Sequence, residues 1–202
     1  MKYSIEWLKN EIKDGKKHTL LGFWGDKADS PQERIYSNFH KSGFTVPVVV
    51  DENGAMEDIT FTCNEQFFMY CKALLFKDME SVSKLLVPNN NPAEYKEIGR
   101  RVKNYDDYIW SQRRYGFMKE GLYHKFTQNN ALKRQLLMTG NKVLVETSPF
   151  DEIWGIRLGK RNRMGKIDKT WLDVNNWRGS NLLGFALMEV RDQIRAEELA
   201  NK

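Results

Sequence analysis

A lysine within an apolar segment is the residue of this sequence best suited to covalent chemistry. In 62-TCNEQFFMYCKALLF-76, Lys72 lies among Phe, Met, Tyr, Cys, Ala and Leu residues. A helix that is apolar on all sides is a buried helix. Burial lowers the pKa of a lysine, and a neutral amine near pH 7 is a nucleophile that forms a Schiff base with an aldehyde-like carbon. The alternative is that the long side chain carries its ammonium to the surface.

Glu65 begins the same segment, seven residues before Lys72. On a helix the two side chains would lie on nearly the same face, about 10 Å apart along the axis, and could flank a bound ligand. Thr62-x-x-Glu65 also matches the capping box, in which both side chains satisfy free amides at a helix start. The capping box explains Glu65 without a ligand, but it does not explain Lys72.

Two other segments carry residues that could contact a nucleotide. In 36-YSNFH-40, the amide of Asn38 could bond a sugar or a base edge, or the residue could simply belong to a turn. In 146-ETSPFDEIWGIRLG-159, Asp151 supplies an acid and Trp154 an indole that could stack on a base. An Asp turn beside a core Trp fits the second segment equally well.

The segment 177-WRGSNLLG-184 opens the last predicted helix. Gly179 allows a close backbone approach, and the free amides around Asn181 would bind a phosphate or a carbonyl group. A simple N-cap is the structural alternative.

Positive charge is concentrated in 157-RLGKRNRMGKIDK-169, where six basic residues accompany the single acid Asp168. The basic residues are Arg157, Lys160, Arg161, Arg163, Lys166 and Lys169. The formal net charge of the whole chain is +5, which favours anionic partners such as phosphates, nucleotides or nucleic acid. A solvated surface loop is the alternative explanation for this segment.

Composition argues against metal and membrane functions. The three histidines, at 18, 40 and 124, are isolated and have no ligand-like spacing, so we expect no metal. No apolar run approaches 18 residues and no signal peptide is evident, so we expect no membrane association and a cytoplasmic protein.

The elements that must position these residues are mostly helices. Amphipathic spacing, turn residues and caps predict a helix-rich α+β fold, a single domain with a small β-sheet. We expect residues 1–18 to be an N-terminal helical extension and residues 19–202 to be the domain. Helices are predicted over 4–15, 62–76, 78–86, 92–109, 111–127, 130–139 and 181–199, and strands over 19–25, 44–50, 59–61 and 142–148. The Asn-Gly pair of 51-DENG-54 predicts that the second and third strands form a hairpin, and Asn91-Pro92 predicts the start of the helix over 92–109.

The order of several separated motifs resembles the NADAR family, also called YbiA-like, over roughly residues 20 to 195. The motifs are Ser37-Asn38-Phe39, 64-NEQFFMYCKA-73, 99-GRRV-102, Trp110, 125-KFTQN-129, 136-LLMTG-140, 144-LVETSPFDEIWGI-156 and 177-WRGSNLLGFALMEVR-191. The resemblance implies a helix-rich α+β fold and a hydrolase that cleaves N-glycosidic bonds without a metal or redox cofactor.

The resemblance also implies a choice of substrates. Some members of the family remove ADP-ribose from guanine in a nucleotide, DNA or RNA, often as antitoxins to ADP-ribosyltransferase toxins or in phage defence. Others hydrolyse phosphorylated intermediates of riboflavin biosynthesis. The first activity is our leading expectation and the second is the alternative. A non-catalytic binding module for ADP-ribose or another NAD derivative is a third hypothesis, which would not need Lys72.

Residue roles follow from the resemblance. Lys72 would attack the anomeric carbon and hold the ring-opened sugar as an iminium, Glu65 would position substrate or move protons, and Asp151 is a second candidate acid or base. The expected substrate contacts are Asn38, Phe39, Gln66, Trp110, Trp154, Gly155, Arg157, Trp177, Gly179 and Asn181.

Three positions depart from the family pattern. Many relatives carry His and Gln where this chain has Gln66 and Met69, and a Gly where it has Arg157. An arginine there could grip a pyrophosphate through its two-pronged guanidinium group.

Overall fold

A computed structural model describes residues 1–25, 31–88, 91–162 and 164–201. The chain divides into two compact units, which we call the central unit (38–133) and the terminal unit (1–37 and 134–202). The predicted helix-rich α+β class is confirmed. Among the described residues the strands form two separate two-stranded sheets, one in each unit, in place of the single small sheet expected from the sequence.

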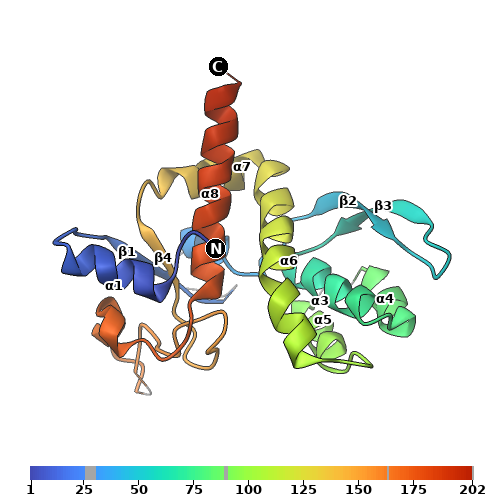
Figure 1. Ribbon diagram of the computed structural model, residues 1–202, viewed down its shortest axis with the longest axis horizontal. Coiled ribbons are helices and arrows are strands. Elements are labelled where there is room, and N and C mark those ends of the chain that lie inside the picture. The colour runs from blue at the N-terminus through green and yellow to red at the C-terminus, as the bar shows by residue number, and fades with distance from the viewer. Residues whose placement is uncertain (26–30, 89–90, 163, 202) are drawn as a thin grey trace. The chain divides into compact units, whose positions relative to one another are not determined.

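The terminal unit is built around a parallel strand pair and one long helix. Strands β1 (Leu20–Phe23) and β4 (Val143–Glu146) pair in parallel, and α8 (Leu182–Ala200) packs on β4 (Figure 1). The residues of β4 are all buried, as a strand covered on both faces requires. The other elements are α1 (Ile5–Lys13), α2 (Pro31–Arg34), η1 (Thr170–Leu172) and η2 (Val174–Asn176), and α7 (Asn130–Met138) contains the boundary between the units.

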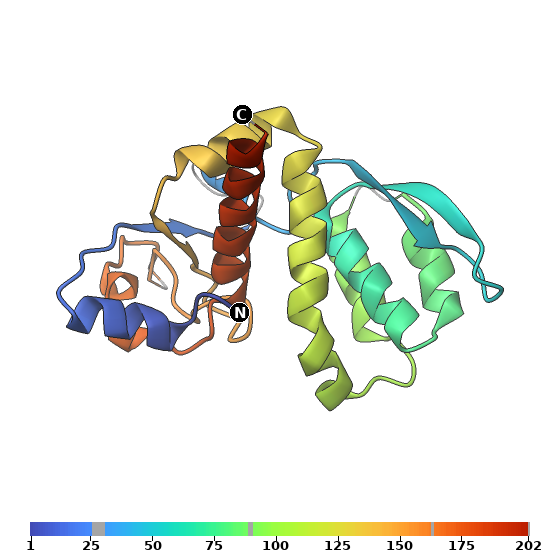
Figure 2. The same ribbon diagram turned by 45° about the horizontal axis from the view of Figure 1, so that its top comes forward.

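The central unit packs a hairpin and three other helices around a buried helix. Strands β2 (Phe44–Val49) and β3 (Met56–Phe61) form the predicted antiparallel hairpin, which runs along one side of the helices (Figure 2). Helix α3 (Asn64–Leu75) contacts α4 (Met79–Leu86), α5 (Pro92–Arg100) and α6 (Asp107–Thr127). Because three helices cover it, nearly every side chain of α3 is buried, as its apolar composition predicted.

The predicted helix over 92–109 is wrong in its second half. Helix α5 begins as expected, with the Asn91 side chain accepting from the Ala93 amide, but it ends at Arg100. The next helix starts at Asp107, earlier than the predicted residue 111, because the Asp106 carboxylate accepts the Ile109 amide and caps a new helix. The loop between the two helices carries one aromatic residue, Tyr105.

The N-terminal helix packs within the terminal unit. Ser4 caps α1, Leu8 is fully buried, and α1 contacts η2. The Tyr3 hydroxyl donates to Asp192 of α8 over 2.6 Å. The predicted boundary at residue 18 stays a prediction.

Gly184 offers a test of the packing of α8 on β4. A Cβ added there would lie 2.1 Å from the Leu144 carbonyl oxygen and 2.6 Å from Asn181 Oδ1. Because backbone must then move, we expect Gly184→Ala to lower the free energy of unfolding by about 1–3 kcal/mol. Chemical denaturation measures this change.

The matched control is Gly116→Ala in α6, where nothing lies within 4 Å of an added Cβ. This variant should gain about 0.5–1 kcal/mol from helix propensity. Equal stabilities for the two variants would contradict the close approach of α8 to β4.

Candidate active site

The start of α3 is not the predicted capping box. The helix begins at Asn64, and Cys63, in the N-cap position, makes no side-chain cap bond. The backbone amide and the hydroxyl of Thr62 both donate to Gln66 Oε1, over 2.7 and 3.0 Å. Gln66 therefore makes the backward contact that the motif assigned to Glu65.

Glu65 is instead buried beside Asn38, as part of a polar cluster in the central unit. Its side chain is 6% exposed, and its backbone amide donates to the Asn38 carbonyl over 3.1 Å. The Asn38 side chain accepts from Asn64 Nδ2 over 2.9 Å and donates to Met118 Sδ. Two of the predicted site residues, Asn38 and Glu65, are thus brought together at the start of α3.

Lys72 lies in the last turn of α3 and is half-buried. Its ammonium donates to the Gly99 carbonyl over 2.8 Å and lies 4.1 Å from the ring centroid of Tyr105 and 5.7 Å from that of Trp110. Burial lowers the pKa of Lys72, and the negative charge of Asp107 partly opposes this effect. The lowered pKa increases the fraction of neutral amine near pH 7, which a nucleophilic lysine needs.

The other predicted contacts of the central unit have structural partners. Gln66 is fully buried, and its amide nitrogen donates to the Leu85 carbonyl over 2.7 Å, so its side chain has a structural role. Trp110 is buried and packs on Phe68, with ring centroids 5.0 Å apart. Phe39 is half-buried, and the Lys96 ammonium lies 5.8 Å from its ring centroid.

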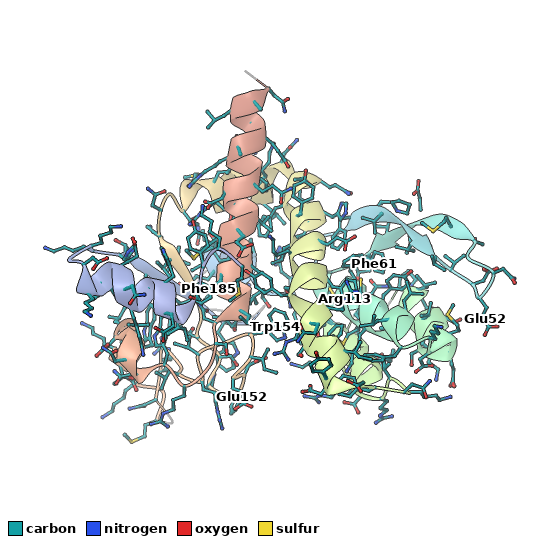
Figure 3. All side chains as sticks on the ribbon, in the orientation of Figure 1. Glu52, Phe61, Arg113, Glu152, Trp154 and Phe185 are labelled. Atoms are coloured by element: carbon teal, nitrogen blue, oxygen red, sulfur yellow. The ribbon has the colours of Figure 1, made fainter. Side chains whose placement is uncertain are left out.

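In the terminal unit, Asp151 makes the Asp turn that was the alternative explanation of its segment. One carboxylate oxygen accepts from the amides of Ile153 and Trp154, over 2.9 and 2.7 Å. Trp154 is half-buried and lies with Glu152 in the loops near the first turns of α8, where Phe185 is buried (Figure 3). The turn fixes both the Asp151 carboxylate and the backbone that carries the Trp154 indole.

The free amides predicted at the start of α8 are occupied, so that expectation is wrong. The amides of residues 180–183 donate to the carbonyls of Glu152, Gly155, Ile153 and Trp154, in that order, over 2.7–3.2 Å. Asn181 is fully buried and makes no cap bond with its side chain.

The Asn181 side chain instead bonds β4. It accepts from the Glu146 amide over 2.9 Å and donates to the Leu144 carbonyl over 3.0 Å. These two bonds account for Asn181 without a ligand.

Close contacts at two glycines and one tryptophan hold the same loops together. A Cβ on Gly179 would lie 2.4 Å from the Gly155 carbonyl oxygen, and one on Gly155 would lie 3.0 Å from two other carbonyl oxygens. The Trp177 indole nitrogen donates to the Trp171 carbonyl over 2.8 Å. These contacts show how the loops before α8 are held.

Arg157 is exposed, forms an ion pair with Glu152 over 2.9 Å, and adopts φ +54°. Positive φ favours glycine, which is the residue that the family resemblance leads us to expect at this position. In the basic segment that follows, Lys160 pairs with Glu33, while Arg163 lies outside the described residues. The predicted phosphate contact by Arg157 stays a prediction.

Sequence reasoning missed two residues of the central unit. Lys125 is fully buried in α6, and burial lowers its pKa to about 7. Its spacing from the buried Met118, Leu122 and Phe126 places it on the apolar face of the helix, which was a readable signal. Tyr105, which covers Lys72, follows no such pattern because it lies in a loop.

Neither a metal centre nor a membrane span is found among the described residues. In that part of the chain no group of three His, Cys, Asp or Glu side chains could hold a metal ion. Its helices are also too short or too polar to cross a bilayer. Cys63 and Cys71 are buried free cysteines.

Comparison with known proteins assigns a family to this arrangement. The family model described as the NADAR domain matches residues 22–195. The chain is 38% identical over 166 residues to protein irg-1 of Caenorhabditis elegans, covering 79% of this chain and 75% of that protein. It is 40% identical over 129 residues to an N-glycosidase of Acanthamoeba polyphaga mimivirus, covering 64% and 72% of the two chains.

A solved structure has a similar fold. The NMR structure of the Escherichia coli protein YbiA aligns with a TM-score of 0.61 at 26% identity, over 91% of this chain and 89% of that one.

Asn181→Ala tests the structural role of this residue. The substitution leaves the buried Glu146 amide and Leu144 carbonyl without their partners, so we expect the free energy of unfolding to fall by about 2–4 kcal/mol. The neighbouring Ser180 is exposed, and Ser180→Ala should change stability by less than about 0.5 kcal/mol. Chemical denaturation of both variants makes the comparison, and a stable Asn181→Ala protein would contradict the assignment.

Lys125 predicts a pH-dependent stability. Because its pKa is lower in the folded protein than the ordinary 10.5, the unfolded chain holds more protons between pH 7 and 10.5. The free energy of unfolding should therefore gain a contribution on the order of a few kcal/mol as pH rises through this window. Lys125→Met should remove that contribution, measured by denaturation at several pH values.

The control for this measurement is Lys41→Met, which removes an exposed lysine of the same unit and should leave the pH dependence unchanged. If the free energy of unfolding changed with pH in the same way in wild type and Lys125→Met, the proposed effect of Lys125 burial on stability would be refuted.

Proposed function

This chain belongs to the NADAR family, and on that premise we propose that it hydrolyses the N-glycosidic bond of ADP-ribosylated guanine in a nucleotide, DNA or RNA. The activity would reverse ADP-ribosylation, and a cognate ADP-ribosyltransferase toxin would act in the same pathway. The coarser activity, hydrolysis of N-glycosyl compounds, is supported by relatives named N-glycosidases in Escherichia coli, Nostoc punctiforme and the mimivirus.

The observation that carries the proposal is the environment of Lys72. An amine with a lowered pKa lies at the end of a buried helix, beside aromatic rings and within reach of solvent. Burial also lowers the pKa of Lys125, to about 7, but this residue is 0% exposed, so a sugar would have no access to its amine. Exposure therefore favours Lys72 as the nucleophile over the second perturbed lysine.

The proposed chemistry follows from a neutral amine. The Lys72 nitrogen bonds to the anomeric carbon as the bond to the guanine nitrogen breaks, and guanine leaves with the electron pair and takes a proton. Transfer of a proton from the lysine nitrogen to the ring oxygen opens the sugar and gives an iminium. Water then adds to the iminium carbon, and departure of the amine restores Lys72 and releases the sugar.

Two carboxyl groups are candidates for the proton transfers. Glu65 is buried beside Asn38, and a carboxylic acid near the leaving base would ease departure by protonating it. Asp151 is the second candidate on the family resemblance alone, and in the terminal unit its carboxylate accepts the amides of Ile153 and Trp154. We assign proton transfer or substrate positioning to Glu65 first.

The substrate proposal has support of a different kind. The net charge of +5 favours a polyanionic substrate over a small phosphorylated metabolite. Hydrolysis of a phosphorylated riboflavin intermediate would need the same lysine. A binding module for ADP-ribose would need a ligand-binding pocket but not the lysine. These alternatives are distinguished by experiment.

Turnover of DNA or RNA that carries ADP-ribosylated guanine, in the presence of borohydride, tests the mechanism. Hydride reduces an iminium to a stable secondary amine, so intact mass should rise by one trapped sugar adduct on Lys72. We expect Lys72→Ala to lose the adduct and to lower kcat by about 100-fold or more, as removal of a catalytic group does. Lys72→Met, which retains the length of the side chain, should behave alike.

The control is Lys41→Ala, an exposed lysine of the central unit, which should trap and turn over like wild type. Unchanged turnover in Lys72→Ala would sink the covalent mechanism. Cleavage of the riboflavin intermediate alone would favour the alternative substrate, and binding of ADP-ribose without any cleavage would favour the binding module.

A further inference from the structure

The Lys72 ammonium is held at the C-terminal end of α5 by two different interactions. It donates to the carbonyl of Gly99, which lies in the last turn of α5, where carbonyls have no partner within the helix. The aligned peptide dipoles make this end of a helix partly negative and favourable to a cation. The Tyr105 ring covers the same ammonium at 4.1 Å from its centroid.

Tyr105 is itself fixed by its neighbours. Its hydroxyl donates to the Asp107 carboxylate over 2.6 Å, and its ring packs edge-on against Phe76, with centroids 5.4 Å apart. It remains 44% exposed, in the loop between α5 and α6. The ring is therefore oriented over Lys72 and is also accessible to an incoming ligand.

We propose that Tyr105 is a positioning residue that holds the Lys72 ammonium against the end of α5 and must move aside before the amine can attack a sugar. The inference rests on the proposed role of Lys72. A sugar carbon cannot enter between the ammonium and a ring centred 4.1 Å away, so attack on this side requires displacement of the ring. The structure thus holds the lysine in a resting arrangement.

The groups around Lys72 decide whether its pKa is raised or lowered. The Gly99 carbonyl, the end of α5, the Tyr105 ring and the Asp107 carboxylate all favour the charged form. Burial opposes them and is the larger effect on the pKa. The two basic residues at the end of α5, Arg100 and Arg101, form ion pairs with Glu97. The Tyr105 hydroxyl is neutral because burial and Asp107 raise its pKa to about 12.

Tyr105→Leu distinguishes the effect of the aromatic π face from the effect of apolar cover over the Lys72 ammonium. Leucine keeps apolar surface over the ammonium but removes the π face, so the charged form loses one of its partners. We expect the Lys72 pKa to fall by about half a unit to one unit. Tyr105→Phe keeps the ring and should leave the pKa close to that of wild type.

Acylation of the purified chain with acetic anhydride at a series of pH values measures the Lys72 pKa without reference to activity. The extent of labelling at Lys72, read by peptide mass spectrometry and normalised to its plateau at high pH, gives the titration midpoint. Tyr108→Leu is the control, because Tyr108 is 76% exposed in the first turn of α6. Its midpoint should equal that of wild type.

The acid limb of the pH profile of kcat is the second readout and should shift with the labelling midpoint in Tyr105→Leu. Coincident midpoints for Tyr105→Leu and wild type would overturn the inference. A shifted labelling midpoint in a chain that forms no borohydride adduct would instead refute the proposed function while leaving the position of Tyr105 established.

Discussion

Burial of α3 is the constraint on which the candidate site depends. Because α4, α5 and α6 all pack on this helix, its charged and amide side chains must find partners inside the central unit. Gln66 bonds Thr62 and Leu85, Glu65 lies beside Asn38, and Lys72 bonds the end of α5. A polar group that cannot reach water has few allowed positions, and this fixes the start and the end of α3.

The two perturbed lysines of the central unit show how burial and access act together. Full burial lowers the pKa of Lys125 to about 7 but shuts out any substrate, whereas Lys72, whose pKa burial also lowers, is only half-buried. A nucleophile needs both a neutral fraction and a path for the electrophile. Half-burial at the end of a helix meets the first requirement, and displacement of the Tyr105 ring would meet the second.

In the terminal unit the loops before α8 are held by backbone rather than by ligands. The amides at the start of α8 bond the carbonyls of 152–155, and Asn181 bonds β4. Gly179 and Gly155 permit the close approach that these bonds require. These bonds hold the loops that carry Asp151, the second candidate acid or base, and Trp154, an expected substrate contact.

The sequence by itself determined the local structure and the main catalytic candidate. Apolar residues on all sides predicted the buried helix α3 and singled out Lys72, Asn91 predicted the start of α5, and the alternating segments around 51-DENG-54 predicted the hairpin. These features depend on neighbours within a turn or two, so a linear pattern records them.

Only the tertiary structure decided which polar groups already have hydrogen-bond partners within the fold. Thr62 and Glu65 matched a capping box, yet Gln66 makes the bond, and the apparent anion site at Asn181 is filled by the carbonyls of residues 152–155. The cover of Lys72 by Tyr105 likewise depends on where a loop of irregular sequence passes. Such contacts depend on which faces of separate elements meet, and no spacing along the chain encodes that meeting directly.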